Sequence, residues 1–168
     1  MREKMKKITR SDIIKRLDKL RQTYARYDGA KKIKGEWVNT CVTCGKRLPC
    51  DKLQGGHFIV RGCYALRWDE KNVSPQCSGC NMFRNGAYIQ YSQWFIKKYG
   101  LETFNQYVDT YERWKQGKIP PFKMPELKQI YDEWLEEGRE LEKKTGLSLF
   151  PKSWDFFGED YLDYDPAD

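Results

Sequence analysis

The sequence of 168 residues lacks the features of a membrane or secreted protein. No run of apolar residues approaches the roughly 18 that a membrane-spanning helix needs. The stretch from Met1 to Arg10 is basic but has no apolar segment of the kind found in secretory signals. We therefore expect a protein of the cytoplasm, where its six cysteines stay reduced and can bind a metal instead of forming disulfides.

Two further absences narrow the functions to be considered. The cysteines do not follow the thioredoxin-like pattern with one CxxC pair that is typical of redox proteins. No recognisable module for reading base edges in the major groove is present, so we expect any contact with DNA to be independent of base sequence.

The charge is unevenly distributed along the chain, although the net charge is +7. Residues 1–50 contain 15 Lys or Arg and five Asp or Glu, whereas residues 155–168 contain six acids and no base. A basic body attracts polyanions, and phosphate backbones are the usual ones. The alternative is that the basic residues only keep the surface solvated. We expect the acidic end to be disordered and solubilising, with mimicry of nucleic acid as the alternative.

The composition predicts a small core, because only 39% of the residues are hydrophobic while 15% are aromatic. Such a core is built from large flat side chains and fits a domain that is braced by a metal. Apolar spacing predicts helices over residues 11–28, 88–99, 101–114 and 125–144. Short strands are expected near residues 54–61 and 64–68, and residues 30–40 are interpreted as a basic connector.

Two CxxC pairs are the strongest motif in the chain. Their cysteines can form the four-thiolate set of a tetrahedral zinc site: Cys41, Cys44, Cys77 and Cys80. Four protein ligands leave no open position, so such a site is structural. The 32 residues between the pairs leave room for a small motif. Cys50 and Cys63 are expected to be small buried hydrophobes or spare thiols.

The only histidine, His57, is followed by Asn72 and Asn81, with 14 and eight residues between them. This is the spacing of an H-N-H nuclease motif in which asparagine replaces the last histidine. In this motif the imidazole takes a proton from the water that attacks a phosphodiester. The middle asparagine holds the loop, and with it the imidazole, in orientation. The last residue binds a divalent cation, expected here to be Mg²⁺ or Mn²⁺.

The segment from Cys41 to Gly100 contains a longer series of motifs. They are Gly56-His57-Phe58-Ile59-x-Arg61, Arg67-Trp68-Asp69-Glu70-Lys71-Asn72-Val73, Gln76-Cys77, Cys80-Asn81 and Lys98-Tyr99-Gly100. Together they resemble the phage NinG family, also called Rap, of recombination endonucleases. The two cysteine pairs around a histidine are also similar to phage endonuclease VII, a Holliday-junction resolvase.

This resemblance implies a zinc-braced ββα-metal nuclease that acts on branched DNA such as Holliday junctions or D-loops. It also implies that His57 is the general base, that Asn81 binds the catalytic metal and that the four cysteines bind zinc. A phage or prophage protein of the host cytoplasm is the corresponding expectation for its location.

One position departs from the pattern of this wider class. The residue before the general base is often an Asp or His that binds the metal, whereas Gly56 has no side chain. Either another oxygen donor replaces it, or the metal is held weakly, or the site is degenerate. Asp51 is a candidate donor because it precedes the histidine strand and could curl back. Asp69 and Glu70 are the other nearby carboxylates, and a solvated turn is the alternative for all three.

Arg61, Arg67 and Arg84 are candidate DNA contacts, because arginine can bind phosphate through two hydrogen bonds. Salt bridges or plain surface charge are the alternative. Trp68 and Phe83 are expected in the core and not as platforms for base stacking.

These observations predict an α+β, mainly helical protein with a zinc-braced ββα-metal (HNH-like) core and flanking N- and C-terminal helices. The expected regions are a basic leader and helix (1–40), the nuclease core (41–100), C-terminal helices (101–150) and an acidic tail (151–168). The leading hypothesis is a metal-dependent DNA endonuclease for branched substrates. Two incisions of a junction suggest a homodimer, although a monomer fits the pattern equally well. The alternatives are a non-catalytic zinc-braced nucleic-acid-binding module and a protein-interaction module.

Overall fold

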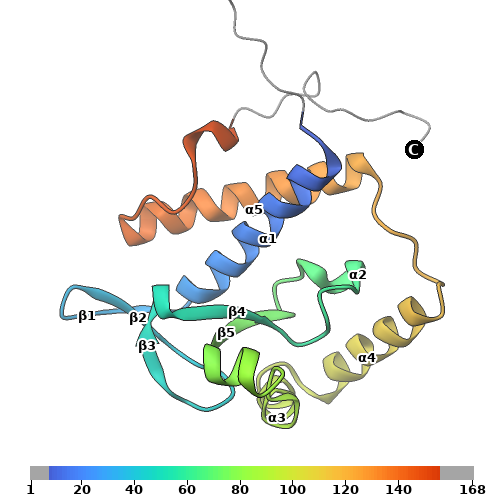
Figure 1. The fold of residues 1–168 in the computed structure, drawn as a ribbon, viewed down its shortest axis with the longest axis horizontal. Helices are drawn as coiled ribbons and strands as arrows, with labels where there is room; N and C mark the ends of the chain where they lie inside the picture. Colours follow the sequence, from blue (N-terminus) through green and yellow to red (C-terminus); the bar gives the residue numbers. More distant parts are fainter. Residues whose placement is uncertain (1–7, 156–168) are drawn as a thin grey trace, which may run out of the picture. The chain divides into compact units, whose positions relative to one another are not determined.

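The computed structural model describes residues 8–155 (Figure 1). The packing divides the chain into two compact units. One contains residues up to Leu20 and from Phe122 onward, and the other runs from Arg21 to Pro121. Helix α1 (Arg10–Tyr27) contributes to both. The expected regions follow the order of the sequence, whereas this division groups the two ends of the chain. Most of the basic leader and most of the acidic tail lie outside the described residues.

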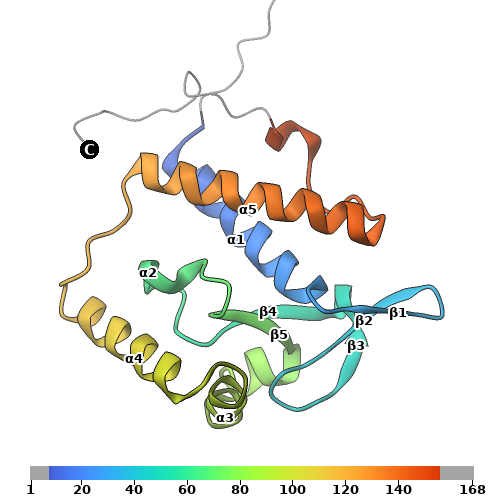
Figure 2. The ribbon, with the colours of Figure 1, turned by 180° about the vertical axis from the view of Figure 1, so that it is seen from behind.

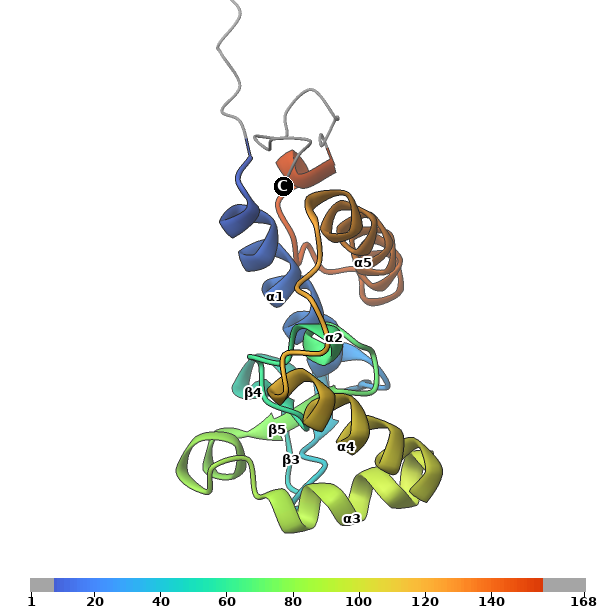
Figure 3. The same cartoon turned by 90° about the vertical axis from the view of Figure 1, so that its right-hand side faces the viewer.

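The first unit is helical (Figure 3). It combines the first half of α1 with α5 (Met124–Thr145) and the short turn η3 (Lys152–Asp155). Gly138 lies where α5 meets its neighbours, because a Cβ there would be only 2.9 Å from Phe150 and 3.1 Å from Leu20. Glu142 accepts hydrogen bonds from the backbone N–H of Leu149 (2.6 Å) and Phe150 (2.9 Å). The chain after α5 is thereby held against the helix.

The second unit contains all the strands of the described chain (Figure 2). The first sheet has the order β1-β2-β3, with β1 (Lys31–Ile33), β2 (Glu36–Thr40) and β3 (Arg47–Pro49). After the turn η1 (Cys50–Lys52), β4 (Leu53–His57) pairs antiparallel with β5 (Val73–Cys77). Their register sets Leu53 opposite Cys77 and His57 opposite Val73.

Helices complete this second unit. The loop between β4 and β5 contains α2 (Tyr64–Arg67), and β5 is followed by one π-helical turn, η2 (Gly79–Phe83). Helices α3 (Tyr88–Tyr99) and α4 (Leu101–Lys115) then follow. Phe58, directly after β4, stacks on Phe95 of α3 with ring centroids 4.4 Å apart. Aromatic rings from the β4–β5 loop, α3 and α4 therefore form much of the core.

The expected class is confirmed: the protein is α+β and mainly helical. The four long helices lie within one or two residues of their predicted positions. Two predictions of local structure are wrong. Residues 30–40 form the β1–β2 hairpin and not a connector, and residues 64–68 contain helix α2 and not a strand.

The true partner of β4 is β5, a strand of five residues that contains Pro75, and a proline within a short run argues against a strand. The fold contains a β-hairpin followed by a helical turn, but this does not by itself identify an HNH core. No helix within residues 8–155 is long and apolar enough to cross a membrane.

Candidate metal centre and histidine site

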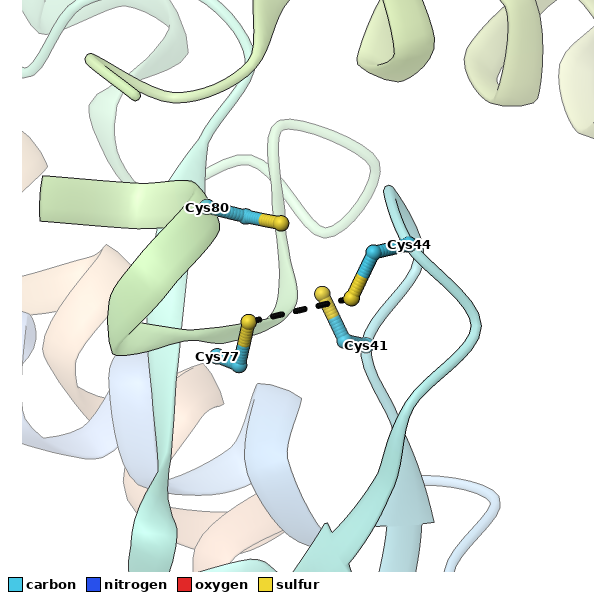
Figure 4. Close-up of side chains that lie close together, drawn as sticks. All are labelled: Cys41, Cys44, Cys77 and Cys80. Carbon is cyan, nitrogen blue, oxygen red and sulfur yellow. Dashed lines mark hydrogen bonds between the residues drawn. The ribbon is translucent and has the colours of Figure 1, made fainter. Parts of the chain in front are cut away.

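The four cysteines of the two CxxC pairs lie together (Figure 4). Cys41 and Cys44 come from the turn between β2 and β3, Cys77 ends β5 and Cys80 lies in η2. Their sulfur atoms all lie within 4.8 Å of one another. A tetrahedral zinc with Zn–S bonds of about 2.3 Å requires sulfurs about 3.8 Å apart. The Sγ atoms of Cys44 and Cys77 are 3.8 Å apart, so the cluster fits a structural metal such as zinc.

The backbone around the cluster fixes the first cysteine pair. Gly45 adopts a positive φ of 75°, and its N–H donates to Cys41 O at 2.9 Å. The N–H of Val42 donates to Pro75 O at 2.9 Å and ties the turn to β5. Burial opposes ionisation of Cys41, but hydrogen bonds from the Thr43 hydroxyl and from backbone groups outweigh it and lower the pKa of this thiol to about 6. The turn therefore favours the thiolate form that a metal binds.

His57 occupies the end of β4, and its ring is oriented by a backbone carbonyl. Its Nε2 lies 3.0 Å from the carbonyl oxygen of Arg67. Because a carbonyl can only accept, this contact selects the tautomer with hydrogen on Nε2. The lone pair that can take a proton then lies on Nδ1.

The fully buried Asn72 closes the loop that contains Arg67. Its Oδ1 accepts from the N–H of Ile59 at 2.7 Å, and its Nδ2 donates to Ile59 O at 3.0 Å and to Leu66 O at 2.8 Å. Leu66 is the neighbour of Arg67, whose carbonyl contacts His57. The side chain of Asn72 therefore fixes the backbone that orients the imidazole.

Two residues outside the sequence motif strengthen the same loop. The buried guanidinium of Arg21 donates to the carbonyl oxygens of Asp69 (3.2 Å), Glu70 and Val73 (2.9 Å). The hydroxyl of Tyr107 in α4 donates to the Asp69 carboxylate. Burial and the hydrogen bond to Asp69 raise the pKa of this hydroxyl, so it stays a donor. Asp69 of the loop thus has a structural partner in α4.

Asn81 is positioned by a different contact. It lies in η2, and its Nδ2 donates to Gln54 Oε1 at 2.8 Å. Side chains alternate along a strand, so Gln54 and His57 of β4 point to opposite faces of the hairpin. Gln54 and His57 are three positions apart in β4, which corresponds to about 10 Å along the strand. The structure therefore brings His57 and Asn72 to one loop and places Asn81 at the metal-cluster end.

Gly56 has no room for a side chain. A Cβ at this position would lie 1.9 Å from Oε1 of the buried Gln76. Asp51 is exposed in η1, at the end of β4 remote from His57, and its carboxylate lies 3.9 Å from Lys52 Nζ. Among residues 8–155, the four cysteines are the only group of three or more His, Cys, Asp or Glu side chains close enough to share an ion.

The three candidate arginines have different surroundings. Arg61 and Arg84 are exposed. The guanidinium of Arg67 lies over the rings of Tyr64 and Trp68, 5.2 Å and 5.4 Å from their centroids.

Two aromatic and two cysteine predictions can be compared with the observed burial. Trp68 is buried as expected, as are Cys50 and Cys63. Phe83 was expected in the core and is 81% exposed, so that prediction is wrong. Phe83 is the last residue of η2, and the turn that follows leaves its side chain in solvent.

Comparison with known proteins agrees with this arrangement of motifs. The model of the family described as NinG, Bacteriophage Lambda NinG protein, matches residues 1–144. The chain belongs to the NinG family. Relatives include the proteins named ninG of Salmonella phage P22 (27% identical over 74 residues) and of Escherichia phage 933W (28% over 74 residues).

These matches to NinG proteins are partial. They cover 44% of this chain and 36% of each relative, so the chain spans well under half the length of the curated relatives it matches. No solved structure matches this NinG-family chain.

Sequence reasoning about this NinG-family site missed Arg21, Gln54 and Tyr107. Gln76 was noted as part of the Gln76-Cys77 motif, but its contacts with Gly86 and with the position of Gly56 were not foreseen. Arg21 and Tyr107 gave no local signal, because their partners lie 48 and 38 residues away.

Proposed function

We propose that this NinG-family protein is a metal-dependent DNA endonuclease that hydrolyses phosphodiester bonds in branched DNA, such as Holliday junctions or D-loops. The observation that supports it most directly is the orientation of His57. A carbonyl at 3.0 Å from Nε2 presets the tautomer in which Nδ1 is the base.

In this proposal Nδ1 of His57 accepts a proton from a water molecule while the water oxygen attacks phosphorus. The bond from phosphorus to the leaving oxygen breaks, and the leaving oxygen takes a proton from solvent. The Arg67 carbonyl stabilises the imidazolium through Nε2–H. The four cysteines would hold zinc, which would brace the two turns at the base of the hairpin.

Asn81 Oδ1 would hold the catalytic Mg²⁺ or Mn²⁺, whose charge would stabilise the phosphate and the leaving oxygen. The hydrogen bond of its Nδ2 to Gln54 directs Oδ1 away from that partner. Asn81 and His57 lie on different faces of the hairpin, so one phosphate does not reach both in this arrangement, and the role of Asn81 is a separate hypothesis with variants of its own.

The test is cleavage of a labelled four-way junction and of a linear duplex with the same sequence. Each is incubated with Mg²⁺, with Mn²⁺ and without added metal. Wild type is compared with His57→Ala and with Asn105→Ala, which changes an exposed residue of α4. Metal-dependent cutting of the junction that His57→Ala abolishes and Asn105→Ala retains supports the proposal. If the linear duplex is cut as fast as the junction, the protein has no preference for branched DNA.

The role of Asn81 is tested with two substitutions. Asn81→Asp keeps an oxygen ligand and should retain metal-dependent cutting, whereas Asn81→Ala should require a much higher concentration of Mg²⁺. Equal Mg²⁺ dependence of both variants and wild type would exclude Asn81 as the ligand.

A non-catalytic nucleic-acid-binding module is the second candidate. It is favoured by Gly56, whose side-chain position is filled by Gln76, and by the separation of His57 from Asn81. Binding of the junction without cutting by zinc-loaded protein would select this candidate. Sedimentation of the free protein and of its junction complex tests the homodimer that two incisions suggest.

A further inference from the structure

The turn between η2 and α3 presents large apolar side chains to solvent. Phe83 is 81% exposed, Ile89 72%, Met82 59% and Tyr88 46%. We call the segment from Met82 to Ile89 the apolar tip. Exposed apolar groups gathered in this way mark interaction surfaces of soluble proteins.

The backbone of the apolar tip is held in an unusual conformation. Asn85, Gly86 and Ala87 all have positive φ (47°, 86° and 48°), which is unfavourable for residues other than glycine. Hydrogen bonds fix it: Gln76 Nε2 donates to Gly86 O at 2.8 Å, and Gly86 N donates to Cys80 O at 2.9 Å. The apolar side chains are thus presented by a turn anchored beside the cysteine cluster, which lowers the cost of ordering them on binding.

The charge of the chain segment that contains the apolar tip favours an anionic partner. The chain from Lys71 to Leu101 contains no Asp or Glu, although the whole sequence contains 24. Arg84 is exposed within the tip, and Lys97 and Lys98 are exposed further along α3. A surface with bases and no acids in its own segment attracts a phosphate backbone.

An open surface hollow of about 400 Å³ lies along the turn that follows Phe83. Its lining combines apolar and hydrogen-bonding groups: Arg84, Asn85, Ala87, Tyr88, Ile89 and Gln90. Amide side chains can pair with base edges, and aromatic rings can stack on any base.

We infer that the apolar tip binds unpaired bases of DNA, with Phe83 stacking on a base and Arg84 contacting the neighbouring phosphate. The inference rests on the proposed function, from which it takes DNA as the substrate. It specifies further that unpaired bases are the part of the DNA that is recognised. A base inside a duplex has both faces covered by its neighbours, so a stacking platform selects bases at a branch or in a single strand.

Binding without added Mg²⁺ or Mn²⁺ tests this inference independently of cleavage. Fluorescence anisotropy measures affinity for a labelled single strand, for a junction with unpaired bases at its centre and for a fully paired duplex. Wild type is compared with Phe83→Ala, Phe83→Trp and Ile33→Ala, which removes an exposed apolar side chain of β1. Circular dichroism and zinc content verify that each variant folds.

Phe83→Ala should weaken binding to the single strand and the unpaired junction by about 5- to 150-fold, the range for loss of one stacked base. Phe83→Trp should keep the affinity, Ile33→Ala should leave it unchanged, and duplex affinity should change little in all variants. A 2-aminopurine placed at the unpaired position should lose fluorescence on binding wild type but not Phe83→Ala.

Equal affinities of wild type and Phe83→Ala for unpaired DNA would overturn the inference, even if junction cutting is observed. If Phe83→Ala weakens binding but wild type cuts no junction, the result would support base binding by the apolar tip and refute the proposed nuclease activity. A dimer that Phe83→Ala converts to a monomer would assign the surface to a second copy of the chain and overturn the inference.

Discussion

Replacing Asn72 with aspartate exchanges one buried amide nitrogen for an oxygen and tests the arrangement that orients His57. The acceptor for the Ile59 N–H remains, but the carbonyl oxygens of Ile59 and Leu66 lose their donor. A buried acceptor left without its donor costs about 1–3 kcal/mol. Two such losses predict that Asn72→Asp lowers the free energy of unfolding by about 2–6 kcal/mol at pH 7.

The pH dependence of this variant has a defined sign. Burial and the two facing carbonyl oxygens both favour the neutral carboxyl, so its pKa in the folded protein is raised above the ordinary aspartate range. Stability is then greatest below that ordinary range. It is lost as the pH rises through the raised pKa, because the unfolded chain releases its proton first.

Urea unfolding followed by tryptophan fluorescence between pH 3 and pH 8 measures this effect. Asn105→Asp is the matched control, because it makes the same change on the exposed surface of α4 and should stay within about 0.5 kcal/mol of wild type. In the junction assay Asn72→Asp should also cut more slowly than Asn105→Asp. Equal unfolding midpoints for the two variants at pH 7 would refute the account of the loop.

Three further predictions follow from other parts of the chain. Cys44→Ser should reduce bound zinc, measured by native mass spectrometry, whereas Cys50→Ala, which changes a buried cysteine outside the cluster, should keep one zinc per chain. Gly56→Ala should destabilise the protein by about 1–3 kcal/mol in urea unfolding, because its Cβ would collide with Gln76, and the added methyl should cost much less in a Gln76→Ala background. Burial acts to raise the pKa of Glu142, but hydrogen bonds from the Phe150 N–H, from Arg139 and from the Leu149 N–H outweigh burial and lower this pKa. Glu142→Gln should therefore cost about 1–3 kcal/mol at pH 7, and the difference should shrink as the pH falls through that lowered pKa.

The sequence alone determined the parts of this protein that depend on local pattern. Helical spacing of apolar residues located α1, α3, α4 and α5, because each helix buries one stripe of its own side chains. The spacing of the CxxC pairs identified four metal-ligand candidates, because two such pairs are the usual way to supply four thiolates. The motifs around His57 led to the NinG family for the same reason: their residues are close in sequence.

Features that depend on partners distant in the sequence could be seen only in the folded protein. The strand β5 was not recognised, since it is only five residues long and Pro75 within it argues against a strand. The orientation of His57 depends on the Arg67 carbonyl, which is in place because Asn72 and the distant Arg21 hold the loop. The exposure of Phe83 could also be seen only in the structure. Its apolar side chain predicts burial, but η2 ends at this residue and the side chain lies in solvent.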